Sequence, residues 1–74
     1  MSAEGLSRFL EVNPEIQGGV PVFRGTRVPA QSLFEHLEAG DSIEDFLEGF
    51  RSVRREQVIG LLVGLKAQTV AVAA

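Results

Sequence analysis

The stretch Asn13-Pro-Glu-Ile-Gln-Gly-Gly-Val-Pro-Val-Phe-Arg-Gly-Thr-Arg-Val-Pro29 decides the fold of this 74-residue chain. It holds three prolines, three glycines and two arginines in seventeen residues, a density typical of a chain forced through defined turns. Gly18-Gly19 suits a tight turn between two extended segments, because glycine takes positive φ at little steric cost. We expect Gly25 to take a left-handed conformation in a second turn, Arg24-Gly25-Thr26-Arg27. Pro29 fixes φ immediately before a helical pattern begins.

The same residues resemble the signature of a known family. Asn13-Pro14, Gly18-Gly19 and the Gly25-Thr26-Arg27 core, at these distances, are similar to the pattern of the "domain of unknown function 433" family. These are small bacterial and archaeal proteins grouped with VapB-type antitoxins and with helix-turn-helix folds. The resemblance runs from about Phe9 to Leu65. It implies a small dimeric antitoxin-like protein, often paired with a PIN-like ribonuclease toxin.

Length and composition limit the classes of protein that the chain can belong to. Residues 1–74 allow one domain, and a chain this short buries only ~60% of its extended-chain surface. Disulfides, metals or oligomerisation usually add the missing stability. The chain has no cysteine and one histidine, so disulfides and thiolate sites are excluded and we expect no metal or other cofactor. Oligomerisation remains, and the family resemblance implies that the oligomer is a homodimer.

The overall charge and the ends of the chain bear on its partners and location. A net charge of −3 argues against strong nonspecific binding to nucleic acid, although a local basic patch stays open. Residues 1–8 are expected to form a flexible leader, and they lack the basic and apolar regions of a signal peptide. Together with the absence of cysteine, this predicts a cytoplasmic protein. Lys66 and Gln68 interrupt an apolar run that is too short to span a membrane.

Hydrophobic periodicity predicts a mainly α fold. A small β-hairpin and turn over residues 9–29 are followed by three helices over residues 30–72, packed as a helix-turn-helix (homeodomain-like) bundle. The expected strands are Phe9–Val12 and Val20–Phe23. Gly40 is expected to end the first helix. The apolar stripes at helical spacing are Leu33, Phe34 and Leu37; Ile43, Phe46, Leu47 and Phe50; and Val58, Leu61, Leu62 and Leu65.

The N-terminal caps of the later helices can also be predicted. Asp41 or Ser42 suits the cap of the second helix, and Ser52 suits that of the third. The chain departs from the family pattern at this point. Proline is usual where Arg51 stands, and a threonine or serine cap is usual where Arg54 stands. The signals for the start of the third helix are therefore weaker here than in the family pattern.

The third helix has a second face, opposite its apolar stripe. Small residues form a row along it: Gly60, Gly64, Ala67 and Ala71. Such a row allows close approach of another helix, and two glycines in mid-helix cost roughly 2 kcal/mol relative to alanine. We therefore predict that this face packs against another chain, through Ile59, Gly60, Val63 and Gly64. The alternative is that Gly60 and Gly64 pack against the protein's own hairpin.

Arginines form two candidate contact groups. The candidate DNA contacts lie at the start of the third helix, where a recognition helix meets bases; they are Arg51, Arg54, Arg55 and Gln57. The alternative is a solvated helix end. Arg24 and Arg27 flank the Gly25 turn and suit a toxin partner, since guanidinium groups grip phosphates or the acidic metal site of a nuclease. Alternatively, both arginines satisfy turn carbonyls or pair with nearby acids.

An enzymatic function is not expected. His36 has no cysteine or second histidine near it in the sequence, and no phosphate-binding glycine motif is present. A usual catalytic pocket also needs a longer chain, so we expect no small-molecule substrate. The expected function is that of a homodimeric antitoxin that blocks a PIN-like ribonuclease toxin, with operator DNA as a candidate further partner. The alternative is a dimerising protein–protein interaction module with no DNA-binding role.

Overall fold

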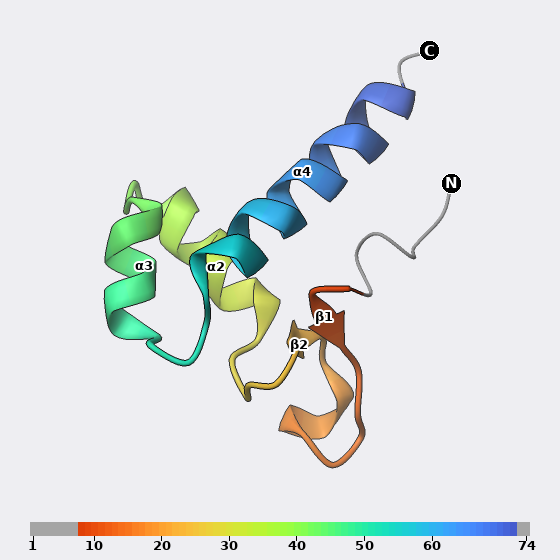
Figure 1. Ribbon diagram of the computed structural model, residues 1–74, viewed down its shortest axis with the longest axis vertical. Helices are drawn as coiled ribbons and strands as arrows, with labels where there is room; N and C mark the ends of the chain where they lie inside the picture. The colour runs from red at the N-terminus through yellow and green to blue at the C-terminus, as the bar shows by residue number, and fades with distance from the viewer. Residues whose placement is uncertain (1–7, 73–74) are drawn as a thin grey trace.

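The computed structural model describes residues 8–72, which form a short hairpin followed by helices (Figure 1). The elements in chain order are β1 (Leu10–Glu11), the 3-10 turn η1 (Gln17–Gly19), β2 (Val22–Phe23), α2 (Ala30–Glu38), α3 (Ile43–Gly49) and α4 (Arg55–Val72). This order confirms the predicted hairpin and three following helices. Residues 1–7 of the predicted leader lie outside the described residues, and Arg8 belongs to a turn that leads into β1.

The two strands are shorter than the extended segments that the sequence predicts. They pair antiparallel, with Leu10 opposite Phe23. The segment before β2 is fastened to the start of α2 instead, since the Ala30 amide donates to the Pro21 carbonyl over 3.0 Å. Val22 also forms an isolated bridge with Pro29. The hairpin and the first helix are therefore one connected unit.

Both predicted turns have the backbone conformations that glycine permits. Gly18 and Gly19 have φ of 68° and 94°, and Gly25 has φ of 79°. Gln17 also has positive φ, at 52°, which is uncommon for a residue with a side chain. Its side-chain Nε2 donates to the Arg27 carbonyl over 3.0 Å. This bond joins the first turn to the second.

The second turn is held by a buried threonine. Thr26 Oγ1 donates to the Phe23 carbonyl over 2.7 Å and accepts from the Val28 amide over 3.0 Å. The Phe23 amide in turn donates to the Val28 carbonyl over 2.9 Å. Opposite, the Gly25 amide donates to Glu11 Oε1 over 2.9 Å. Thr26 thus closes the turn from inside and Glu11 closes it from β1.

The core lies where the hairpin, α2 and α3 meet the first half of α4 (Figure 1). Its buried apolar residues are Val22, Phe23, Ala30, Leu33, Phe46, Val53, Val58 and Leu61. The ring centroids of Phe23 and Phe46 are 6.0 Å apart, and those of Phe46 and Phe50 are 4.8 Å apart. Beyond Leu61, α4 contributes no buried residue.

The ends of α2 and α3 follow the expected signals. Gly40, with φ of 88°, comes directly after the last turn of α2. Ser42 caps α3, because its Oγ accepts from the Asp45 amide over 3.0 Å while Asp45 Oδ2 accepts from the Ser42 amide over 3.1 Å. The hydrogen bonds with the Ser42 backbone and side chain lower the pKa of Asp45 from its ordinary value of 3.8.

The prediction that Ser52 caps the last helix is wrong. The helix α4 begins at Arg55, because Val53 turns inward and is buried in the core. The residue before the helix is Arg54, whose amide donates to Gln57 Oε1 over 2.9 Å. A glutamine side chain inside the first turn therefore satisfies the backbone at the helix start.

Candidate protein-binding surface

The helix α4 carries an apolar stripe that the other residues of the described range, 8–72, leave exposed. Ile59, Val63 and Val70 are 38%, 52% and 65% exposed. At 3.6 residues per turn these three positions lie within an arc of about 40° around the helix. They therefore form a single face, which we call the outer stripe. Ile59 and Val63 belong to the predicted partner contacts, and the structure leaves both accessible.

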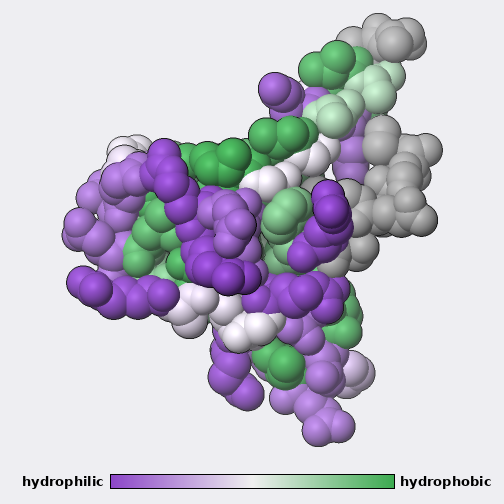
Figure 2. Space-filling view, viewed as in Figure 1, coloured by the Kyte–Doolittle hydropathy of each residue, from purple (hydrophilic) through white to green (hydrophobic). Residues whose placement is uncertain are grey.

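The C-terminal half of α4 projects beyond the other elements (Figure 1). Figure 2 shows hydrophobic surface along the helix toward this projecting end, where Val72 is 84% exposed. A helical segment as short as this projecting half is marginally stable in water on its own, and helices in proteins gain most of their stability from packing. The projecting half of α4 therefore has the composition and exposure of a segment that binds another molecule.

Gly60 does not belong to that exposed face. A Cβ atom at this position would lie 2.3–2.7 Å from three ring atoms of Phe9, closer than real Cβ atoms come to other atoms. The missing side chain of Gly60 thus makes room for an aromatic ring from the residue before β1. For Gly60 the structure shows the alternative, packing against the protein's own hairpin segment, and an intermolecular contact stays a prediction. Gly64 is half-buried.

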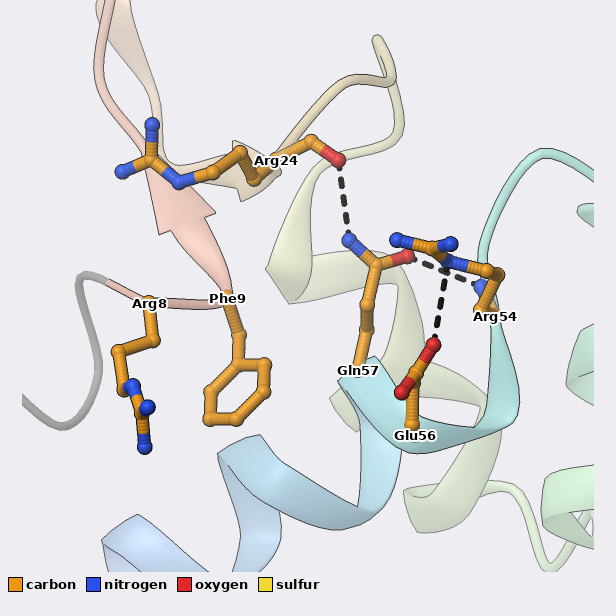
Figure 3. A pocket seen from close by; sticks show the side chains of 6 residues that line it. All are labelled: Arg8, Phe9, Arg24, Arg54, Glu56 and Gln57. Carbon is orange, nitrogen blue, oxygen red and sulfur yellow. Dashed lines mark hydrogen bonds and ion pairs between the residues drawn. The ribbon is translucent and has the colours of Figure 1, made fainter.

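A cleft lined by arginines lies at the N-terminal end of α4 (Figure 3). It has a volume of about 180 Å³ and is lined by Arg8, Phe9, Arg24, Arg54, Glu56 and Gln57. We call it the arginine cleft. Arg24 Nη2 donates to the Leu10 carbonyl over 2.7 Å, and Arg54 Nε lies 3.4 Å from Glu56 Oε1. Arg27 is exposed and does not line the cleft. The cleft brings one arginine from each predicted group to the same place.

Gln57 joins two walls of the arginine cleft and is buried, whereas the predicted contact with DNA would need an exposed side chain. The residue is only 6% exposed. Its Nε2 donates to the Arg24 carbonyl and its Oε1 accepts from the Arg54 amide, both over 2.9 Å (Figure 3). Because Gln57 is buried and both ends of its amide have backbone partners, its side chain is turned into the fold and not toward a DNA base. Its role in this structure is to fasten the second turn to the start of α4.

The remaining candidate DNA contacts lie beside carboxylates. The guanidinium of Arg55 forms an ion pair with Glu44 of α3. Arg51 lines a surface depression together with Glu44, Leu47 and Glu48. Acidic side chains therefore surround the basic residues at this end of the molecule. They reduce the positive potential that contact with DNA phosphates requires.

His36 lies between a carboxylate and two aromatic rings. Its Nδ1 lies 2.9 Å from Asp41 Oδ2, and its ring stands edge-on to Phe46 and Phe50 at centroid distances of 5.5 and 5.7 Å. Within residues 8–72 no group of three or more histidine, aspartate or glutamate side chains is placed to hold a metal ion. Over the same residues, no helix has the length and apolar character needed to cross a membrane.

Comparison with known proteins identifies the family. The chain is 44% identical over 46 residues to the "Uncharacterized protein y4eO" of Sinorhizobium fredii (strain NBRC 101917 / NGR234). Those residues are 62% of this chain and 21% of that protein, so the chain matches about a fifth of its relative's length. No solved structure matches the chain. The profile of the family described as "Protein of unknown function (DUF433)" matches residues 10–62, from β1 into α4, and the chain belongs to that family.

Proposed function

We propose that this protein is the antitoxin-like component of a type II toxin–antitoxin system. In this proposal it acts in the cytoplasm as a homodimer, has no chemistry of its own, and blocks a PIN-like ribonuclease toxin by covering its acidic site. The observation that carries the proposal is the exposure of the outer stripe on a projecting helix. The resemblance of the Gly25-Thr26-Arg27 signature to antitoxin-like proteins supplies the class of partner.

The outer stripe has the geometry of a helix that docks into an apolar groove. In that mode of recognition, apolar residues on one helical face insert into pockets of the partner. Ile59 and Val63 are one turn apart, and Val70 continues the same face two turns further on. Val63 and Val70 are more than half exposed, so docking would remove apolar surface from water on both sides of Lys66, which lies on the turn between them. That removal is favourable at about 25 cal/mol per Å².

The arginine cleft adds a charge that suits a nuclease. Arg8, Arg24 and Arg54 line it from three separate segments of the chain. Guanidinium groups form forked, charge-assisted hydrogen bonds with carboxylates, which are the ligands expected in the metal site of such an enzyme. In our proposal the outer stripe anchors the toxin, and the arginine cleft lies against its acidic site.

Co-expression with the product of the neighbouring gene tests this proposal. The wild-type chain should retain a small nuclease during affinity purification, and the double variant V63Q/V70Q should retain much less. A71Q is the matched control, because Ala71 is an exposed neighbour of Val70 that points away from the outer stripe. Failure of the wild-type chain to retain or inhibit the nuclease would overturn the antitoxin proposal. Equal retention by wild type and V63Q/V70Q would remove the outer stripe from it.

A second candidate function is a dimerising interaction module with no DNA-binding role. The carboxylates beside Arg51, Arg54 and Arg55 favour it over an antitoxin that also represses its own operon. A mobility-shift titration with the promoter DNA at several salt concentrations separates the two. If DNA is bound, R54A and R55A should weaken the binding and flatten its dependence on salt. Absence of a shift at low salt removes the repressor role.

A further inference from the structure

A second apolar surface lies on the other side of α4, about half a helical turn from the outer stripe. It is a groove of about 280 Å³ between the hairpin, the start of α2 and the middle of α4. The lining residues are Leu10, Val20, Pro21, Pro29, Ala30, Gln31, Phe34, Leu61 and Leu65. We call it the apolar groove. None of its lining residues carries a charge, and Val20 at its edge is 43% exposed.

The wall of this groove continues into the projecting half of α4. Leu65 lines the groove, and Val72 lies on nearly the same side of the helix, about 10 Å further along. Gln68 and Thr69, the residues between them on this side, are uncharged. Each chain therefore has an apolar groove and, directly beside it, an exposed apolar helix end of the kind that such a groove accepts.

We propose that a second copy of this chain packs its α4 antiparallel to this one, so that each copy places Val72 in the apolar groove of the other, against Val20. The inference rests on the proposed homodimer and specifies its interface. Because groove and helix end lie on one face of α4, a two-fold axis near the stretch between Leu65 and Gln68 fills both grooves at once. Such an isologous contact is the commonest form of protein dimer.

The size and charge of the groove suit this occupant. An apolar cavity of roughly 150 Å³ accommodates one benzene molecule, so the groove has room for Val72 and a second small aliphatic side chain. The described residues that line the groove, and Gln68, Thr69 and Val72 beyond it, carry no charge, although each chain has a net charge of −3. The outer stripe stays uncovered in this dimer. One helix can therefore serve the homodimer through Val72 and the toxin through Val63 and Val70.

Charge-pair exchange tests the proposed interface. Sedimentation or light scattering over roughly 10–500 µM should show wild type passing from 8.0 kDa to twice that mass as concentration rises. V72E and V20K should each raise the dimer dissociation constant at least tenfold, because each places a charge in an apolar contact. Both valines are exposed in the single chain, so neither substitution should unfold it. An equimolar mixture of V72E and V20K should regain dimer, because one groove then holds a Glu–Lys pair and the other is native.

Two matched controls complete the test. V70E and V12K introduce the same charges at exposed valines outside the apolar groove and should dimerise as wild type does. A wild-type chain that stays at 8.0 kDa throughout would overturn the homodimer and its interface together. A dimer that tolerates V72E, or a mixture that does not recover, would overturn this interface only. Nuclease retention is scored separately, and V72E should preserve it while V70E should not.

Discussion

The contact between Gly60 and Phe9 gives a prediction in which two effects of one substitution oppose each other. Gly60→Ala places a better helix former inside α4, which stabilises a helix by about 1 kcal/mol. The added Cβ, however, would stand 2.3–2.7 Å from the Phe9 ring, which must move. Adding a methyl group to a filled site costs about 1–3 kcal/mol. The difference predicts that G60A is destabilised by about 0–2 kcal/mol, even though it removes a mid-helix glycine.

Removing the ring should reverse the sign of the effect. In an F9A background the new methyl group has free space, so G60A should then stabilise the protein by about 1 kcal/mol. The two changes should therefore be coupled by about 1–3 kcal/mol in a double-mutant cycle. Urea unfolding followed by circular dichroism, at one fixed protein concentration because association shifts apparent stability, measures all four proteins.

Gly49→Ala is the matched control, since Gly49 ends α3 and a Cβ there meets nothing within 4 Å. G49A should be neutral or stabilise the protein, by up to about 1 kcal/mol. If G60A stabilises the wild-type chain by as much as it stabilises F9A, the ring of Phe9 does not rest on Gly60. The assignment of this small-residue surface to the chain's own packing would then be wrong, and the intermolecular interpretation would return.

Two further predictions concern the buried and capping side chains. Gln57→Ala removes two hydrogen bonds, to Arg24 and Arg54, and should cost about 2 kcal/mol in urea unfolding, at roughly 1 kcal/mol for each bond; no loss would mean that the second turn does not depend on Gln57. Ser42→Ala should cost about 1 kcal/mol. Because hydrogen bonds with Ser42 lower the pKa of Asp45 below 3.8, the ionised carboxylate stabilises the fold above that pH. This contribution is lost as pH falls through the lowered pKa, so D45N should be less stable than wild type at pH 6 and should converge with it in acid.

The turns and helices could be predicted from sequence because their signals are local. Gly18-Gly19 and Gly25 mark the turns, and Ser42 followed by Asp45 marks a capped helix start. The strands were predicted too long, since Pro21 bonds to the start of α2 instead of to β1. Thr26 gave no comparable signal. Its two hydrogen bonds depend on Phe23 and Val28 being folded around it.

The candidate sites were harder to predict because they depend on contacts between distant segments. A polar residue at a helix start suggests exposure, yet Gln57 lies one turn before Leu61 and so on the core side of α4. That spacing was a usable signal for its burial. Arg8, the last residue of the predicted leader, was not predicted to belong to a site. It lines the arginine cleft next to Phe9, whose carbonyl accepts from the Arg24 amide over 2.8 Å.

The small-residue row of α4 shows why a sequence pattern alone does not choose a partner. A helix surface of small residues leaves space for any flat or slender group. An aromatic ring can fill that space as well as the backbone of another helix can. This chain provides such a ring, Phe9, and thereby uses the Gly60 surface within one molecule. The apolar residues that α4 still exposes must then be explained by their own geometry. Val70 and Val72 are two residues apart but face different sides, so single substitutions at these positions can separate the proposed toxin binding from the proposed dimerisation.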